Sequence, residues 1–221
     1  MMAGLEDGGF AVLPALNSPA DCDSLRQLYD DERRFRSTVL MARHGYGLGE
    51  YRYFNYPLPA AVQTLRERLY AELVPVANRW AERLNDDARY PDSHAEFVAR
   101  CYATGQTRPT PLLLRYRRGD YNCLHQDLYG SLAFPFQVIC LLSEPGRDFE
   151  GGELVLVEQR PRRQSRPSVV HLRAGDAVVI ATNHLPRAGK RGHYRAALKH
   201  GVSTVTRGER YTLGVIFHDA L

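Results

Sequence analysis

Apolar positions recur with two different periods in the two halves of the chain. Over residues 62–84 they return every three or four positions, which predicts an amphipathic helix that Pro75 would kink. The pair Ser18–Pro19 indicates the start of an earlier helix. A third helix is expected where Ser93 and Glu96 form a capping-box pattern. We therefore expect a largely helical first half.

The second half changes to short β-rich runs separated by Gly- and Pro-containing turns. These runs cover residues 112–117, 134–142, 153–157, 168–172, 177–181, 202–206 and 211–217. Many short strands at this spacing indicate a sandwich, jelly roll or barrel. Since no repeat or linker divides the chain, we expect one domain over residues 1–221, mainly β with N-terminal helices.

Composition excludes several classes of protein. The 221 residues are 44% hydrophobic, and no apolar run reaches the roughly 20 residues of a membrane-spanning helix. The first ten residues carry no basic cluster followed by an apolar run, so we expect a cytoplasmic protein with no membrane partner. The four cysteines are widely spaced and form no C-x-x-C pair, which favours reduced thiols over disulfides or a zinc site.

Positive charge is concentrated in one segment. Residues 160–210 contain twelve Lys and Arg against two acidic residues, a net +10, although the whole chain carries only +4. Such asymmetry favours a polyanionic partner, because Lys and Arg neutralise phosphates and release counterions. The alternative is a set of solvated loops.

The segment His125-Gln126-Asp127 is a candidate metal site. On an extended chain, residues two apart point to the same side, so the imidazole and the carboxylate could converge on one ion. A second such pair, His94 and Glu96, falls in a predicted helix, where positions two apart diverge, and we exclude it.

A third metal ligand is suggested by His200 and the Arg210 that follows it. We expect His200 to open a strand and Arg210 to begin the next antiparallel strand, with the guanidinium across the pair from the imidazole. An Arg directed at a metal centre indicates an anionic ligand. Two His and one carboxylate form the donor set of non-haem Fe(II) oxygenases. For any single histidine, an ordinary structural role is the alternative.

Several motifs resemble those of a known enzyme superfamily. Residues 115–127 are similar to the R-Y-x-x-G-x(5)-H-x-D segment of Fe(II)/2-oxoglutarate dioxygenases, and the Leu-His-Gln-Asp ending resembles that of the AlkB alkylated-DNA demethylases. Residues 119–130, 151–153, 158–161 and 200–202 resemble a bacterial family, Oxygenase-NA, expected to demethylate damaged DNA bases. The resemblance implies a double-stranded β-helix, a cupin-like jelly roll braced by α-helices. Its catalytic core would be residues 111–221, with residues 1–110 as a helical support that could also take part in substrate recognition.

The resemblance also implies roles for individual residues. Three would bind Fe(II): His125, Asp127 and His200. Arg210 would hold the distal carboxylate of 2-oxoglutarate, with Thr212 as a second donor on the same strand, and Tyr116 would donate to the co-substrate.

Two positions depart from AlkB. The chain has Ile216 where AlkB has a second Arg, and Leu114 where AlkB has an Asn. The ten-residue step from His200 to Arg210 is instead similar to that of prolyl hydroxylases.

The implied chemistry is oxidative. O2 and 2-oxoglutarate would be converted to succinate and CO2 while a substrate C–H bond is hydroxylated, and an N-methylated base would then lose formaldehyde. The carboxylate of Asp127 argues against a halogenase, because such enzymes lack it.

Candidate substrate contacts lie in basic and aromatic segments. Arg160, Arg162 and Arg163, together with Arg191 in a long connection before His200, could contact the phosphates of damaged DNA. In the aromatic segment over residues 43–56, two tyrosines could stack on a base. These are Tyr51 and Tyr53, for which core packing is the alternative.

Two other functions stay open. A protein or peptide hydroxylase of the prolyl type is favoured by the His200 to Arg210 spacing and disfavoured by the uneven basic charge. A non-catalytic jelly-roll binding module would need His125 and Asp127 to be ordinary surface residues.

Overall fold

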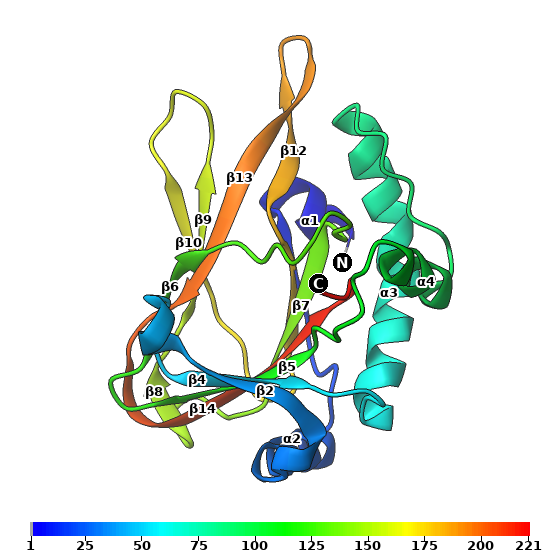
Figure 1. The fold of residues 1–221 in the computed structure, drawn as a ribbon. Helices are drawn as coiled ribbons and strands as arrows, with labels where there is room; N and C mark the ends of the chain where they lie inside the picture. Colours follow the sequence, from blue (N-terminus) through cyan, green and yellow to red (C-terminus); the bar gives the residue numbers. More distant parts are fainter. Residues whose placement is uncertain (1) are drawn as a thin grey trace.

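Two antiparallel β-sheets form the body of the protein in the computed structural model, which describes residues 2–221 (Figure 1). The larger, eight-stranded sheet has the order β1 (Phe10–Leu13), β11 (Ala177–Ala181), β7 (Phe136–Leu141), β14 (Val205–Ile216), β5 (Leu112–Arg117), β4 (Glu50–Phe54) and β2 (Phe35–Leu40), with β8 (Phe149–Gly151) pairing to β14. The six-stranded sheet has the order β10 (Arg166–Val170), β9 (Leu154–Gln159), β13 (Gly192–Val202), β6 (Tyr121–His125) and β3 (Gly47–Leu48), with β12 (His184–Gly189) pairing to β13. This two-sheet arrangement confirms the expected jelly roll.

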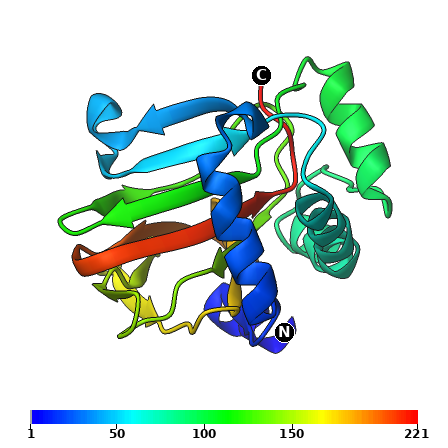
Figure 2. The same cartoon turned by 90° about the horizontal axis from the view of Figure 1, so that it is seen from below.

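Helices brace the sheets from outside. They are α1 (Met2–Gly8), α2 (Pro19–Gln27), α3 (Ala60–Arg83) and α4 (His94–Ala103), with 3-10 turns at Leu28–Asp30, Glu32–Arg34 and Met41–His44. Figure 2 shows α3 and α4 together at one side of the sheets and α2 lying across the larger sheet. No helix of the described chain is both long and apolar enough to cross a bilayer.

The long helix α3 follows the apolar period of its sequence. Its buried face includes Leu65, Leu69 and Trp80, and the Trp80 ring meets Phe136 of β7 edge-on, with 4.6 Å between centroids. The helix continues through Pro75. Burial of this aromatic and aliphatic face fixes the helix against the larger sheet.

Two expectations for the first half of the chain are wrong. Residues 1–110 also contain β1, β2, β3 and β4, and three of these strands extend the larger sheet. The strands are short, and β2 and β4 are mostly half-buried, so their sequences show no clean apolar alternation. At α4, Ser93 makes no side-chain cap bond; Glu96 instead pairs with Arg100, one turn later, at 2.6 Å. The capping box occurs at α2, between Ser18 and Asp21.

The segment before His200 is a hairpin and not the long connection that we expected. Strands β12 and β13 pair along their length up to Gly189 and Gly192, which flank a turn at Lys190 and Arg191. The outer half of the hairpin is largely exposed, so its sequence lacks the alternation of apolar and polar residues by which a strand is recognised. Similarly, the strand expected at residues 202–206 is divided: β13 ends at Val202 and β14 begins at Val205.

Candidate metal centre

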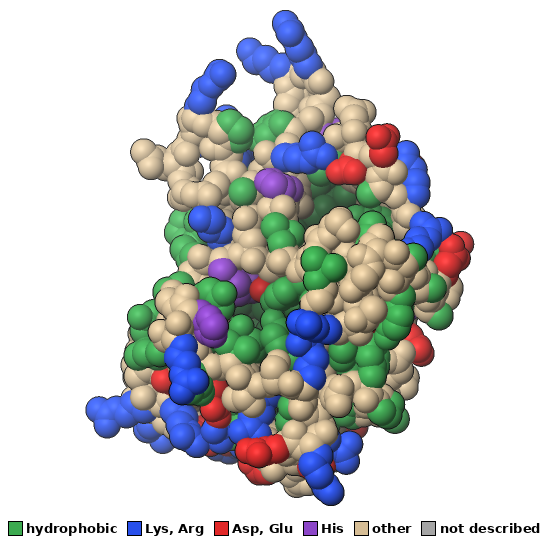
Figure 3. Space-filling model, in the orientation of Figure 1, with side chains coloured by type: hydrophobic (Ala, Val, Ile, Leu, Met, Phe, Trp, Pro, Cys, Tyr) green, Lys and Arg blue, Asp and Glu red, His purple; other side chains and the backbone are tan. Residues whose placement is uncertain are grey.

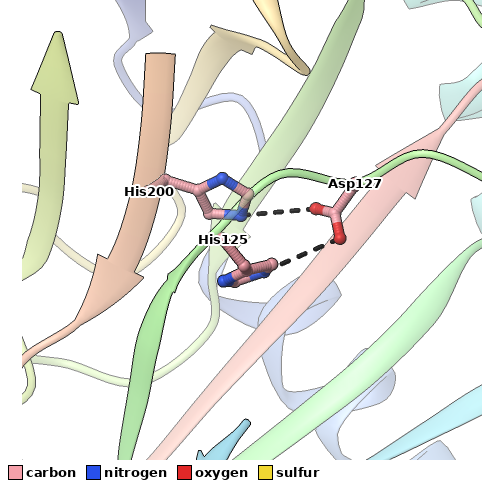
Figure 4. A group of neighbouring side chains, drawn as sticks. All are labelled: His125, Asp127 and His200. Carbon is pink, nitrogen blue, oxygen red and sulfur yellow. Dashed lines mark ion pairs between the residues drawn. The ribbon is translucent and has the colours of Figure 1, made fainter. Parts of the chain in front are cut away.

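Two histidines and one aspartate converge at the inner face of the smaller sheet. His125 ends β6 and lies directly opposite His200 of β13 in the strand register. Asp127 follows in the adjoining loop, and Figure 4 shows its carboxylate directed at both rings. The Oδ2 atom of Asp127 is 3.3 Å from Nε2 of His200, and Oδ1 is 3.6 Å from Nε2 of His125. All three ligand atoms lie within 4.8 Å of one another, so they could hold one metal ion.

Hydrogen bonds fix the orientation of these side chains. Nδ1 of His125 lies 2.8 Å from the carbonyl of Cys123, so a proton on Nδ1 leaves the Nε2 lone pair directed at the centre. The Tyr129 hydroxyl donates to Oδ1 of Asp127, and the Gln137 amide donates to Oδ2, both at 2.8 Å. Each carboxylate oxygen is thus oriented by its own donor.

The electrostatics favour the metal-binding protonation states. Burial opposes ionisation of Asp127, but hydrogen bonds from His200 and Tyr129 and the charge of the nearby imidazoles outweigh it, holding the carboxyl pKa well below its usual range. Burial and the neighbouring His200 lower the pKa of His125. At neutral pH the site therefore offers an ionised carboxylate and a neutral imidazole from His125, the forms that bind metals.

A cavity of about 360 Å³ extends from this centre into the space between the sheets. Its far wall comes from the larger sheet and includes Tyr116 on β5 and Arg210 and Thr212 on β14. We expected His200 to open a strand and Arg210 to begin the strand paired with it, and this is wrong: His200 lies near the end of β13, and Arg210 lies inside β14, which belongs to the other sheet. The turn after Val202 moves the chain from one sheet to the other, so the two residues face each other across the cavity.

Arg210 is buried without an ion pair inside the described chain, and the charge of Glu153 acts on it only from beyond ion-pair distance. Its side chain is 2% exposed, its Nε has no hydrogen-bond partner, and it forms no ion pair with any carboxylate of the described chain. Its guanidinium lies 5.6 Å from the Tyr116 ring centroid and 5.9 Å from that of Phe149. Burial lowers the pKa of Arg210, yet a guanidinium stays protonated at neutral pH. A buried, unpaired cation in a cavity wall favours an anionic ligand.

Neighbouring residues complete this wall. Gly152 lies so close that a Cβ there would be 2.9 Å from Cδ of Arg210. The Tyr116 hydroxyl accepts a hydrogen bond from Asn122 at 3.3 Å, and burial raises its pKa to about 12, so it stays a neutral donor. Thr212, two residues after Arg210 on β14, is also buried and lines the cavity.

Three residues of the site, Gln137, Tyr129 and Asn122, were not expected from the sequence. Gln137 had a readable signal, because it is the one polar residue in the apolar run Phe136–Leu141. Tyr129 and Asn122 lie within four residues of His125, but only the folded loop shows their contacts. The exclusion of His94 is consistent with the structure: it is 5% exposed, and its Nε2 lies 2.9 Å from the carbonyl of Phe217.

The expected phosphate contacts lie on two projecting hairpins. Figure 3 shows Lys and Arg side chains at the tips of both hairpins, above a hollow lined by hydrophobic and His side chains. Arg162 and Arg163 lie in the β9–β10 connection and Arg191 in the β12–β13 turn; all three are exposed, and none has an ion pair within the described chain. Arg160 differs, because its guanidinium binds Glu158 at 2.7 Å.

The two tyrosines proposed to stack on a base are placed differently. Tyr51 is half-buried and lines the cavity. Tyr53 is 8% exposed and lies beneath the Arg36 guanidinium, 4.5 Å from its ring centroid, and against Tyr129. Because Arg36 and Tyr129 already pack against the Tyr53 ring, the structure argues against Tyr53 as a surface on which a base stacks.

The amino-acid sequence matches a known protein family and a relative of similar length. Residues 49–220 match the model of the family Oxygenase-NA, described as "Oxygenase, catalysing oxidative methylation of damaged DNA". An uncharacterized protein of Mycobacterium tuberculosis, present in two strains, is 44% identical over 191 residues, which cover 85% of this chain and 82% of that protein.

Solved structures agree on the fold. A Pseudomonas putida prolyl-4-hydroxylase superposes with a TM-score of 0.57 at 14% identity, over 99% of this chain and 96% of the other. An oxidoreductase of the 2OG-Fe(II) oxygenase family from Burkholderia pseudomallei superposes with a TM-score of 0.53 at 17% identity, over 99% and 89%. By its sequence match, its fold and its donor set, the chain belongs to the Oxygenase-NA family and is a 2-oxoglutarate/Fe(II) oxygenase.

Proposed function

We propose that the protein oxidatively removes methyl groups from damaged nucleic-acid bases, consuming O2 and 2-oxoglutarate and releasing succinate, CO2 and formaldehyde. The observation that carries the proposal is the metal triad facing a buried, unpaired Arg210 across one cavity. The family description, with damaged DNA as substrate, supports the choice of substrate.

Residues of the smaller sheet and the loop after its strand β6 would bind the metal, and residues of the larger sheet would bind the co-substrate. His125, Asp127 and His200 would hold Fe(II) on one octahedral face, which leaves three positions for other ligands. Bound Fe(II) would supply the activation of O2 that is coupled to decarboxylation of the keto acid. Arg210 would bind the distal carboxylate of 2-oxoglutarate, with the hydroxyls of Thr212 and Tyr116 as further donors. All these residues belong to the proposed core, residues 111–221.

The balance of atoms shows why oxidation would remove a methyl group and not add one. One atom of O2 enters succinate as the other oxidises a substrate C–H bond to C–OH, and the lost carboxylate leaves as CO2. An N-methyl group becomes N–CH2OH, which breaks its C–N bond to give formaldehyde and the free base. Oxidation of a methylated base therefore removes its methyl group.

The basic hairpin tips support a nucleic-acid substrate. Arg162, Arg163 and Arg191 are exposed cations without ion pairs in the described chain, in the connections at the tips of the β9–β10 and β12–β13 hairpins, where Figure 3 shows Lys and Arg side chains. Such side chains bind phosphates with an affinity that falls as salt rises.

Peptide hydroxylation is the second candidate. It is favoured by the ten-residue step from His200 to Arg210 that resembles prolyl hydroxylases. The unpaired basic tips favour the nucleic acid over a peptide.

The test loads the protein anaerobically with Fe(II) and 2-oxoglutarate, admits O2, and measures succinate and formaldehyde. The substrates are an N-methylated oligonucleotide, its unmethylated twin and a proline-containing peptide. Formaldehyde from the methylated strand alone, lost in His125→Ala and Arg210→Ala, supports the proposal. Succinate formation that responds to the peptide and ignores the methylated strand would identify a peptide hydroxylase. No succinate with any substrate would favour a binding module.

A further inference from the structure

Exposed apolar side chains gather at the opening of the metal-site cavity. Of the ten large hydrophobic side chains that are exposed in the described chain, five lie on or beside β3 and β6: Tyr46, Leu48, Tyr121, Leu124 and Leu128. Three of them, Tyr46, Leu124 and Leu128, also line the cavity and are 49%, 46% and 52% exposed. A half-exposed apolar rim around a reactive centre favours a ligand that covers it.

Backbone hydrogen bonds hold Tyr46 at this rim. Its backbone N–H donates to the carbonyl of Met41 at 3.2 Å, and its carbonyl accepts from the N–H of Cys123 at 2.8 Å. Cys123 lies two residues before the metal-site residue His125, so Tyr46 is tied to the strand that ends at the metal centre. Its ring stacks on the ring of His44, with centroids 5.3 Å apart and planes 20° from parallel.

A glycine next to Tyr46 permits this close approach. Gly47 has φ +127 and pairs with Asn122, and a Cβ at Gly47 would lie 2.3 Å from the carbonyl oxygen of Tyr121. Only glycine therefore lets β3 lie this close to β6. The backbone geometry places a flat aromatic ring beside the entrance to the metal site.

Resting on the proposed function, we infer that Tyr46 is the surface on which the target base stacks as it enters the cavity, with Leu124 and Leu128 as the apolar rim around it. A base must leave its own stack to reach a buried metal centre, and an aromatic ring replaces the lost stacking. The exposed, unpaired arginines of the hairpin tips favour a nucleotide over a proline-containing peptide as the occupant of this rim.

The test compares Tyr46→Ala with Tyr46→Phe, which keeps the ring. Tyr102→Ala is the matched control, because Tyr102 is a similarly exposed tyrosine, at 46%, on α4, and it does not line the cavity. The first readout is kcat and KM for formaldehyde release from a single-stranded, N-methylated oligonucleotide. The second is the fluorescence of a strand with 2-aminopurine at the target position, which stacking quenches. Thermal melting establishes that each variant is folded.

We expect Tyr46→Ala to raise KM about tenfold to a hundredfold, the loss of one base–aromatic stack, and to abolish the quenching. Tyr46→Phe and Tyr102→Ala should retain both properties of the wild type. If the wild type demethylates the strand and Tyr46→Ala has the same KM and the same quenching as the wild type, the stacking inference is overturned while the proposed function stands. No formaldehyde from any methylated strand with the wild type would overturn the proposed function itself.

Discussion

Replacing Arg210 by Met should have opposite effects on stability with and without 2-oxoglutarate. Arg210 is 2% exposed, its Nε has no hydrogen-bond partner and it forms no ion pair in the described chain, so the free protein bears the cost of a poorly satisfied buried cation. Relief of such a cost is worth about 1–3 kcal/mol. In the wild type, the contacts of the guanidinium with the Tyr116 and Phe149 rings already offset about 1 kcal/mol of this cost. We therefore expect Arg210→Met to raise the free energy of unfolding by about 1 kcal/mol, or about 2–4 °C in Tm.

Adding 2-oxoglutarate reverses the order. A ligand at 100 times its Kd stabilises the folded state by about 2.7 kcal/mol, which corresponds to a rise in Tm of about 5–10 °C. The wild type should gain this stabilisation, and Arg210→Met should gain little of it, because the distal carboxylate has lost its partner.

The assay is thermal melting with Mn(II) in place of Fe(II), with and without 2-oxoglutarate. Arg207→Met is the control, because Arg207 is on the same strand but is exposed and pairs with Glu150 at 2.7 Å. Its Tm should change little and its response to 2-oxoglutarate not at all. Equal stabilisation of Arg210→Met and the wild type by 2-oxoglutarate would refute the assignment of Arg210, and destabilisation without the ligand would refute the argument from the unpaired cation.

Three further predictions concern metal affinity, pH and salt. Gln137→Leu removes a donor to Asp127 and should weaken Mn(II) binding about 10- to 100-fold by titration; an unchanged Kd would show that Gln137 does not orient the carboxylate. Burial lowers the pKa of His94 to about 4 from 6.5, so unfolding binds a proton and stability should fall as pH drops from about 6.5 to 4. His94→Gln should flatten that decline in a denaturant series across this pH range, and an undiminished slope would contradict the assignment. Arg163→Ala and Arg191→Ala should each reduce the salt dependence of single-strand affinity by about one unit in slope, and a slope equal to wild type would exclude that side chain from phosphate contact.

The fold class could be predicted from the sequence because its signals are local. The apolar stripe of α3 shows the helical period, β9 alternates, and β7 and β11 are short, almost continuous apolar runs. The strands β2, β4 and the outer part of β13 could not be read this way. They are only partly buried along much of their length, so apolar and polar residues do not alternate cleanly.

The candidate site likewise has residues that the local sequence indicated and positions that depend on the tertiary fold. His125 and Asp127 are two residues apart, so their spacing suggested convergence, and the pattern of His200 followed by Arg210 suggested a third ligand, which the family resemblance then supported. The position of Arg210 across the cavity could not be predicted, because it depends on a turn that carries the chain between sheets. The aromatic segment over residues 43–56 was recognised, but not the place of Tyr46 at the cavity rim, because that place depends on pairing of β3 with β6, whose residues lie more than 70 positions apart.

The most direct test of the account is the ratio of succinate to formaldehyde during turnover of a methylated strand. With Fe(II), 2-oxoglutarate and O2, we expect each formaldehyde released to accompany one succinate, and succinate to fall to the uncoupled level when the unmethylated twin replaces the substrate. Succinate production that is the same with both strands, with no formaldehyde, would contradict base demethylation as the reaction of this site.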